Sequence, residues 1–174
     1  MEEENEYVSP RNVGLKFGAI SGVLGILSTV LQDVLSMHQS TIFQVSGFVI
    51  LLALIFLAHR EYKSNGDGFM EYGQGVGIGF WFGLVSSVIS AGFLFVYIKF
   101  ISSDFMDAIR EQQILALEEQ GMSDSQIEQQ LQMMETFTGP TAMLIFGILG
   151  GILFSVIAAL IVSAFTKNAR PEFE

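Results

Sequence analysis

The stretch TAMLIFGILGGILFSVIAALIVSAF, residues 141–165, decides the fold class because it carries no charged side chain over its whole length. About 20 predominantly apolar residues in a helix cross the hydrocarbon core of a bilayer, which is roughly 30 Å thick. A transmembrane strand is much shorter, and lipid tolerates no unpaired backbone polar groups. The stretch therefore predicts a transmembrane helix.

Three further apolar blocks precede it, at residues 13–31, 42–58 and 75–98. Each is long enough, or nearly so, to cross a bilayer as a helix, and the short second block should stand nearly upright. We therefore expect one membrane domain over residues 1–174. Its fold class is all-α: an integral membrane four-helix bundle.

The composition agrees with lipid as the main solvent. Hydrophobic residues make up 51% of the chain and charged residues 15%, whereas a soluble domain has about 25% charged residues. The net charge of −10 argues against a nucleic-acid partner, since such binding needs basic patches. The chain has no cysteine, which excludes disulfides, thiolate nucleophiles and cysteine metal sites.

The basic residues predict the orientation in the membrane. Six of the eight fall on one side of a four-span topology, and the other two fall on the opposite side. The first side holds Arg11, Lys16, Arg60, Lys63, Lys167 and Arg170, and the second holds Lys99 and Arg110. Because basic residues favour the cytoplasmic side, both termini are expected there. Residues His59–Lys63 are the clearest predicted cytoplasmic loop.

Small residues recur at four-residue spacing in three of the four spans, which lets helix backbones approach closely. They are Gly14, Gly18 and Gly22; Gly75, Gly79 and Gly83; and Gly147, Gly151, Ser155 and Ala159. We predict that these ridges pack the bundle internally. The alternative is that one ridge faces outward and binds a second copy or another membrane protein. The second span has no ridge and should sit peripherally.

An acidic segment, residues 102–139, separates the last two spans and holds eight acidic residues against one arginine. It is predicted to form an extramembrane helical hairpin. Ser103 would cap its first helix and Gly121 would end it. Ser123 and Gln126 have the spacing of a capping box for the second helix. The hairpin either covers the spans or offers a docking surface to a partner protein.

No catalytic or metal-binding constellation emerges from the sequence. His38 and His59 fall on opposite sides of the predicted membrane, so they cannot share a metal. The glycine-rich run at residues 73–79 does not match a nucleotide-binding loop in any register. We therefore expect no enzyme activity and no cofactor.

Few polar groups fall inside the spans. They are Gln44 and the hydroxyls of Ser86, Ser87, Ser90 and Ser155. Such hydroxyls mostly bond to the preceding turn or to a neighbouring helix, so they do not predict a pore. Asp33 and Lys16 lie near span ends, and Glu71 lies in the loop before the third span.

Two motifs carry a family resemblance. Gly68, Phe69, Tyr72, Gly73, Gln74 and Gly75 open the third span, and Glu119–Ser123 read EQGMS in the acidic segment. With four spans, they resemble the bacterial membrane family catalogued as domain of unknown function 4199, over nearly the whole chain. The resemblance implies a bacterial inner membrane, a periplasmic acidic segment and no assigned activity.

The resemblance directs attention to Tyr72 and Gln74. Their simplest roles are interfacial anchoring and a hydrogen bond at a helix start. For the whole protein, we favour a non-enzymatic structural, scaffold or accessory component of a membrane complex. The alternatives are a small oligomeric transporter or channel, and a membrane-interface enzyme using Asp33, Glu71 or His59 as acid or base.

Overall fold

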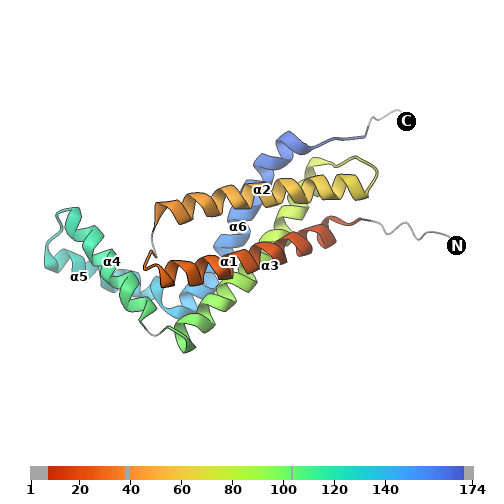
Figure 1. The fold of residues 1–174 in the computed structure, drawn as a ribbon. Coiled ribbons are helices and arrows are strands. Elements are labelled where there is room, and N and C mark those ends of the chain that lie inside the picture. The colour runs from red at the N-terminus through yellow and green to blue at the C-terminus, as the bar shows by residue number, and fades with distance from the viewer. Residues whose placement is uncertain (1–7, 38–39, 103, 171–174) are drawn as a thin grey trace.

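The computed structural model describes residues 8–37, 40–102 and 104–170 (Figure 1). The helices are α1 (Pro10–Val34), α2 (Thr41–Asn65), α3 (Tyr72–Phe100), α4 (Phe105–Glu119), α5 (Asp124–Thr138) and α6 (Pro140–Thr166). Four of them, α1, α2, α3 and α6, are long and apolar enough to cross a membrane. The described chain is thus an all-α membrane bundle with a helical hairpin between α3 and α6, as predicted.

The long helices contain the predicted apolar blocks and extend past them at both ends. The largest extension is at the end of α2. Residues His59–Lys63 were predicted to be a loop, and this prediction is wrong, because α2 continues through them to Asn65. Arginine, glutamate and lysine are good helix formers, so the backbone hydrogen bonding continues beyond the point where the apolar run stops.

Helix α3 is the centre of the bundle, with α1 against one side and α6 against the other. A Cβ added to Gly18 would contact the backbone of Phe82, and one added to Gly79 would overlap Ala159. Backbone approach this close needs small residues at the contact.

Every predicted packing residue lies at one of these two contacts. On α1, the contact residues are Gly14, Gly18 and Gly22; on α3, Gly75, Gly79 and Gly83; and on α6, Gly147, Gly151, Ser155 and Ala159. The ridges therefore serve contacts within the chain. Helix α2, which has no ridge, packs over α1 and α6 more than over α3.

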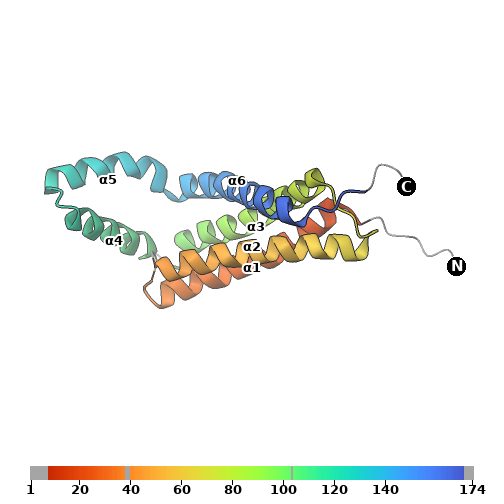
Figure 2. The same cartoon turned by 90° about the horizontal axis from the view of Figure 1, so that it is seen from above.

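The two halves of the bundle are packed differently. We call the end where α1 begins and α6 ends the terminal end, and the end where α4 and α5 attach the hairpin end. The largest buried core lies in the half toward the terminal end, and includes Phe17, Ile55, Ile78, Phe82 and Ala159. Helices α2 and α6 draw apart toward the hairpin end (Figures 1 and 2).

The hairpin projects beyond the hairpin end (Figure 2). The predicted cap Ser103 lies outside the described residues, and Asp104 occupies the N-cap of α4. Gly121, with φ +77°, follows α4 in the left-handed conformation that favours glycine. The backbone N–H of Ser123 donates to Gln126 Oε1 at 2.9 Å, so the predicted capping box forms.

Two apolar clusters hold the hairpin. Phe105 packs edge to face on Tyr97, with ring centroids 5.9 Å apart, and so seats α4 on the end of α3. Farther out, Leu117 of α4 packs with Ile127 and Leu131 of α5. The hairpin is thus joined to the bundle at its base and holds together through a small core of its own.

Candidate functional site

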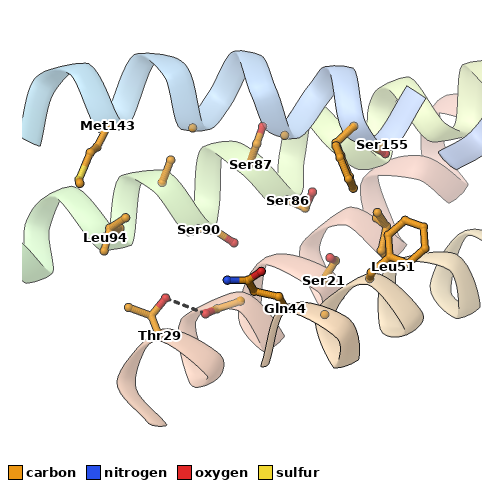
Figure 3. Close-up of a pocket in the computed structure, with 17 residues that line it drawn as sticks. Ser21, Thr29, Gln44, Leu51, Ser86, Ser87, Ser90, Leu94, Met143 and Ser155 are labelled. Atoms are coloured by element: carbon orange, nitrogen blue, oxygen red, sulfur yellow. Dashed lines mark hydrogen bonds between the residues drawn. The ribbon is translucent and has the colours of Figure 1, made fainter. Parts of the chain in front are cut away.

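A cavity of about 570 Å³ lies among the four membrane-spanning helices, in the half toward the hairpin end (Figure 3). All four helices line it. The lining residues are Ser21, Gly25 and Thr29 of α1; Gln44, Gly47, Phe48 and Leu51 of α2; Ser86, Ser87, Ser90, Ala91 and Leu94 of α3; and Met143, Gly147, Gly151, Phe154 and Ser155 of α6. Pockets for small molecules are typically about 300–1,000 Å³, so this cavity has the size of a ligand site.

The cavity exists because two helices diverge and small residues face the space between them. Phe48 of α2 and Phe154 of α6 meet edge to face with ring centroids 6.0 Å apart. Beyond that contact the two helices separate (Figure 2). Gly47 faces the opening, and a Cβ added there would meet no atom within 4 Å. Helix α2 has no ridge of small residues and leaves a space beside the other helices, whereas the ridges of α1, α3 and α6 bring those helices into close contact.

Hydroxyl groups line the wall opposite α2. Those of Thr29, Ser86 and Ser87 donate to carbonyls of their own helices at 3.0–3.3 Å. The hydroxyl of Ser90 donates to a carbonyl of α1 at 3.4 Å, and that of Ser155 to a carbonyl of α3 at 2.8 Å. The expectation that span hydroxyls bond to a preceding turn or a neighbouring helix is confirmed. The sequence did not indicate that they share one cavity.

Besides the hydroxyls, which include that of Ser21, the lining of the cavity has one amide side chain, that of Gln44. Its side chain extends from α2 toward α1 and α3, and its amide ends near Ser90 and Thr29 (Figure 3). The amide makes no hydrogen bond to any residue in the described part of the chain. Gln44 is exposed in the first turn of α2. Its amide is therefore open to a partner that is not part of the bundle's own packing.

A second polar cluster lies at the terminal end and is centred on His59, which is fully buried. Its Nδ1 atom lies 2.8 Å from Thr166 Oγ1, and its Nε2 atom lies 3.0 Å from the Gly75 carbonyl oxygen. Because a carbonyl only accepts, Nε2 carries the proton. Lys63 Nζ donates to the Thr166 carbonyl at 2.9 Å. This cluster joins the ends of α2 and α6 to the start of α3.

The loop between α2 and α3 is tied to the segment that follows α6. Met70 and Asn168 exchange two backbone hydrogen bonds of 2.9 Å. The side-chain amide of Asn168 donates to the Gly68 carbonyl at 3.1 Å, and Arg170 forms an ion pair with Asp67. The loop contains the start of the glycine-rich motif that carried the family resemblance.

Four further candidate residues named from the sequence, Asp33, Glu71, Tyr72 and Gln74, lie at two ends of the bundle. Glu71 is the N-cap of α3, and its backbone N–H donates to Gln74 Oε1 at 2.8 Å. The Tyr72 hydroxyl donates to the Leu160 carbonyl at 3.2 Å. Asp33, near the hairpin end, accepts a hydrogen bond of 2.6 Å from the Tyr97 hydroxyl. Each thus has a hydrogen bond that starts a helix or joins two helices.

The structure does not bring these four residues to the cavity. Sequence reasoning missed the cavity, although Gln44 offered a signal as the amide side chain inside an otherwise apolar block. His38 lies outside the described residues. Among the residues that the structure describes, no group of three or more histidine, aspartate or glutamate side chains is placed to hold a metal.

Four apolar helices around a cavity, with an acidic hairpin at one end, define a small multi-pass membrane protein of the all-α class. The chain belongs to the family described as "Protein of unknown function (DUF4199)", whose model matches residues 16–168. The resemblance drawn from the two sequence motifs is therefore confirmed. No curated protein and no solved structure matches the chain.

Proposed function

We propose that the protein is a non-enzymatic membrane component that takes a small apolar or amphiphilic molecule from the bilayer and holds it between its helices. The observation that carries this proposal is the cavity of about 570 Å³, which all four membrane-spanning helices line. Ligand sites are mostly apolar with a few well-placed polar groups. The cavity has that character, with Phe48, Phe154 and Met143 beside Gln44 and the serine hydroxyls.

The lining residues favour binding over catalysis. None of them carries an ionisable side chain, so the wall offers no general acid or base to a reaction. The bundle also favours binding over transport. A transporter needs access to its site from both sides of the membrane, and the core around Phe17, Ile78 and Phe82 fills the half toward the terminal end.

The accessory role follows from the hairpin. A protein that binds a ligand without converting it would transfer the ligand to a partner protein, or signal to that partner that the ligand is bound. Leu115 and Met133 are 53% and 63% exposed on the acidic hairpin, and methionine adapts readily to a partner surface. We therefore propose the hairpin as the place where another protein of a membrane complex docks.

For location, we propose a bacterial inner membrane with the terminal end in the cytoplasm and the hairpin in the periplasm. The distribution of basic residues supports this orientation. Arg11 and Lys16 lie near the start of α1, Arg60 and Lys63 near the end of α2, and Lys167 and Arg170 beyond α6. The hairpin end has only Lys99 and Arg110 among the described residues.

Two glycine variants test the proposed function. Gly47→Leu adds a side chain to the cavity at a position where no atom obstructs it. Gly150→Leu is the matched control, since Gly150 of α6 is equally unobstructed but does not line the cavity. Each full-length protein would be purified from native membranes in a mild detergent and analysed by native mass spectrometry.

We expect a co-purified molecule on the wild type and on the Gly150→Leu variant, and loss of that molecule from the Gly47→Leu variant. If all three proteins carry the same molecule in the same amount, or if none carries any, the proposed function is wrong. Circular dichroism of each variant would show that the helices are intact.

A further inference from the structure

We infer that the molecule held in the cavity is an uncharged single-chain lipid with a hydroxyl group, which lies against Gln44 with the chain directed toward Phe48 and Phe154. This inference rests on the proposed function and adds the chemical class and orientation of the ligand. Three observations carry it: the use of the wall hydroxyls as donors, the charges around the cavity, and the position of the free amide.

The wall has more acceptors than free donors, because among the described residues that line it only Ser21 and the Gln44 amide have protons that are not already used. Ser90, Ser155 and Thr29 already donate to backbone carbonyls, as do Ser86 and Ser87. A serine or threonine hydroxyl has one proton but two lone pairs, so each of these groups still accepts. A ligand that uses these acceptors brings a donor of its own. A hydroxyl group does so, whereas an ester or a carboxylate has no proton and could bond only to the Gln44 amide N–H and the Ser21 hydroxyl.

The charges around the cavity favour an uncharged ligand. No lysine, arginine or histidine lines the cavity, so a phosphate or carboxylate would enter an apolar space without a counter-charge, at high cost. Asp33 lies one helical turn beyond Thr29 on α1 and is hydrogen-bonded to Tyr97. A carboxylate at that place would repel an anionic head group further.

Gln44 supplies both halves of a hydrogen-bonding pair. Its carbonyl oxygen accepts the ligand's hydroxyl proton, and its amide N–H donates to the ligand's oxygen. A ligand hydroxyl would therefore satisfy an amide that has no partner among the described residues. Gln44 lies in the first turn of α2, near the hairpin end, whereas Phe48 and Leu51 lie deeper. The ligand then has its polar end toward the membrane surface, as amphiphiles do in a bilayer.

The size of the cavity limits the ligand to one chain. About 570 Å³ falls within the range for drug-sized molecules, roughly 300–1,000 Å³. A phospholipid with two acyl chains and a head group is larger than such molecules. The divergence of α2 and α6 places the opening between two lipid-facing helices (Figure 2), so a membrane lipid can enter from the side.

Photocrosslinking with matched probes tests the inference. The full-length protein would be reconstituted in vesicles of phosphatidylcholine and phosphatidylglycerol. Three probes of equal chain length, each with a diazirine in the chain, would be added: a long-chain alcohol, the corresponding fatty acid and the corresponding hydrocarbon. Labelled peptides would be identified by mass spectrometry. We expect the alcohol to label α2 and α6 at the cavity about tenfold more than the fatty acid does. The reason is that the alcohol gains an ordinary hydrogen bond, whereas the fatty acid brings an unpaired charge into the cavity.

Variants assign the preference to Gln44. Gln44→Leu should lower labelling by the alcohol about tenfold and leave labelling by the hydrocarbon unchanged, which also shows that the cavity persists. Thr29→Val, which removes one acceptor with little change of shape, should lower labelling by the alcohol severalfold. Gln129→Leu, at an exposed position of α5, is the matched control and should change nothing.

The outcomes separate the two proposals. If the fatty acid labels the cavity as well as the alcohol does, or if Gln44→Leu leaves the alcohol's labelling intact, the inferred ligand class is wrong. Loss of all labelling in the Gly47→Leu variant would still support the proposed function in that case. If Gly47→Leu changes no labelling by any probe, the proposed function fails, and the ligand class fails with it.

Discussion

The imidazole of His59 and the hydroxyl of Thr166 lie 2.8 Å apart, although 107 positions separate the two residues in the chain. The other ring nitrogen of His59 lies 3.0 Å from the Gly75 carbonyl oxygen. One buried side chain therefore joins α2, α3 and α6. This junction lies at the terminal end, where the bundle is well packed, whereas the cavity lies in the other half.

Replacing His59 by alanine should destabilise the bundle by about 1–3 kcal/mol, because it removes the buried hydrogen bonds to the Gly75 carbonyl and to the Thr166 hydroxyl, which keeps only its bond to the Val162 carbonyl. The measurement is thermal unfolding of the purified protein in detergent, followed by circular dichroism. Arg60→Ala is the matched control, since Arg60 is the next residue on α2 and is exposed. Equal unfolding temperatures for the two variants would contradict a structural role for His59.

A methyl group on Gly79 should separate α3 from α6. The added Cβ would overlap Ala159, and overpacking of this kind typically costs about 1–3 kcal/mol. Gly79→Ala should therefore unfold at a lower temperature than the wild type. Gly92→Ala is the control within the same helix, because a Cβ there meets nothing within 4 Å. The control should be neutral or slightly stabilising, since alanine favours helix over glycine by about 0.5–1 kcal/mol. A stable Gly79→Ala protein would mean that α3 and α6 are not in this close contact.

Gln74 should act through the start of α3 and not through chemistry. Its Oε1 atom accepts from the backbone of Glu71 at 2.8 Å, which is half of a capping box. Gln74→Ala should cost about 1 kcal/mol of stability, in line with the loss of other helix caps. Gln74→Glu retains the accepting oxygen and should restore stability. If Gln74→Glu is as impaired as Gln74→Ala in a cellular phenotype while both proteins are equally stable, the side chain has a role beyond capping.

The proposed orientation can be measured directly, because the chain has no cysteine of its own. Single cysteines would be introduced as Ser125→Cys in the hairpin and Ser64→Cys near the end of α2, both at exposed positions. A membrane-impermeant maleimide applied to cells with a permeable outer membrane should label Ser125→Cys and leave Ser64→Cys unlabelled. After the cells are broken open, both should react. Labelling of Ser64→Cys alone in whole cells would reverse the orientation.

Much of the architecture follows from local patterns. The run at residues 141–165 predicts a transmembrane helix because partition into lipid depends on the length and composition of the segment itself. Gly14 and Gly79 predict helix contacts because a missing side chain permits close approach with any helical partner. The capping box at Ser123 could be predicted because its interacting groups lie only three residues apart. Glu71 and Gln74 have the same spacing.

The sequence by itself determined how many helices are apolar and long enough to cross the membrane, which helix faces carry small residues, and where the second hairpin helix begins. The tertiary structure alone decided that Gln44, Ser90 and Thr29 share a cavity and that His59 is buried against Thr166. The physical reason is the range of the interactions. Helix formation, capping and partition into lipid depend on residues within a turn or within one span. The cavity depends on the angle at which α2 crosses α6, and that angle is set by contacts between segments that are far apart in the chain.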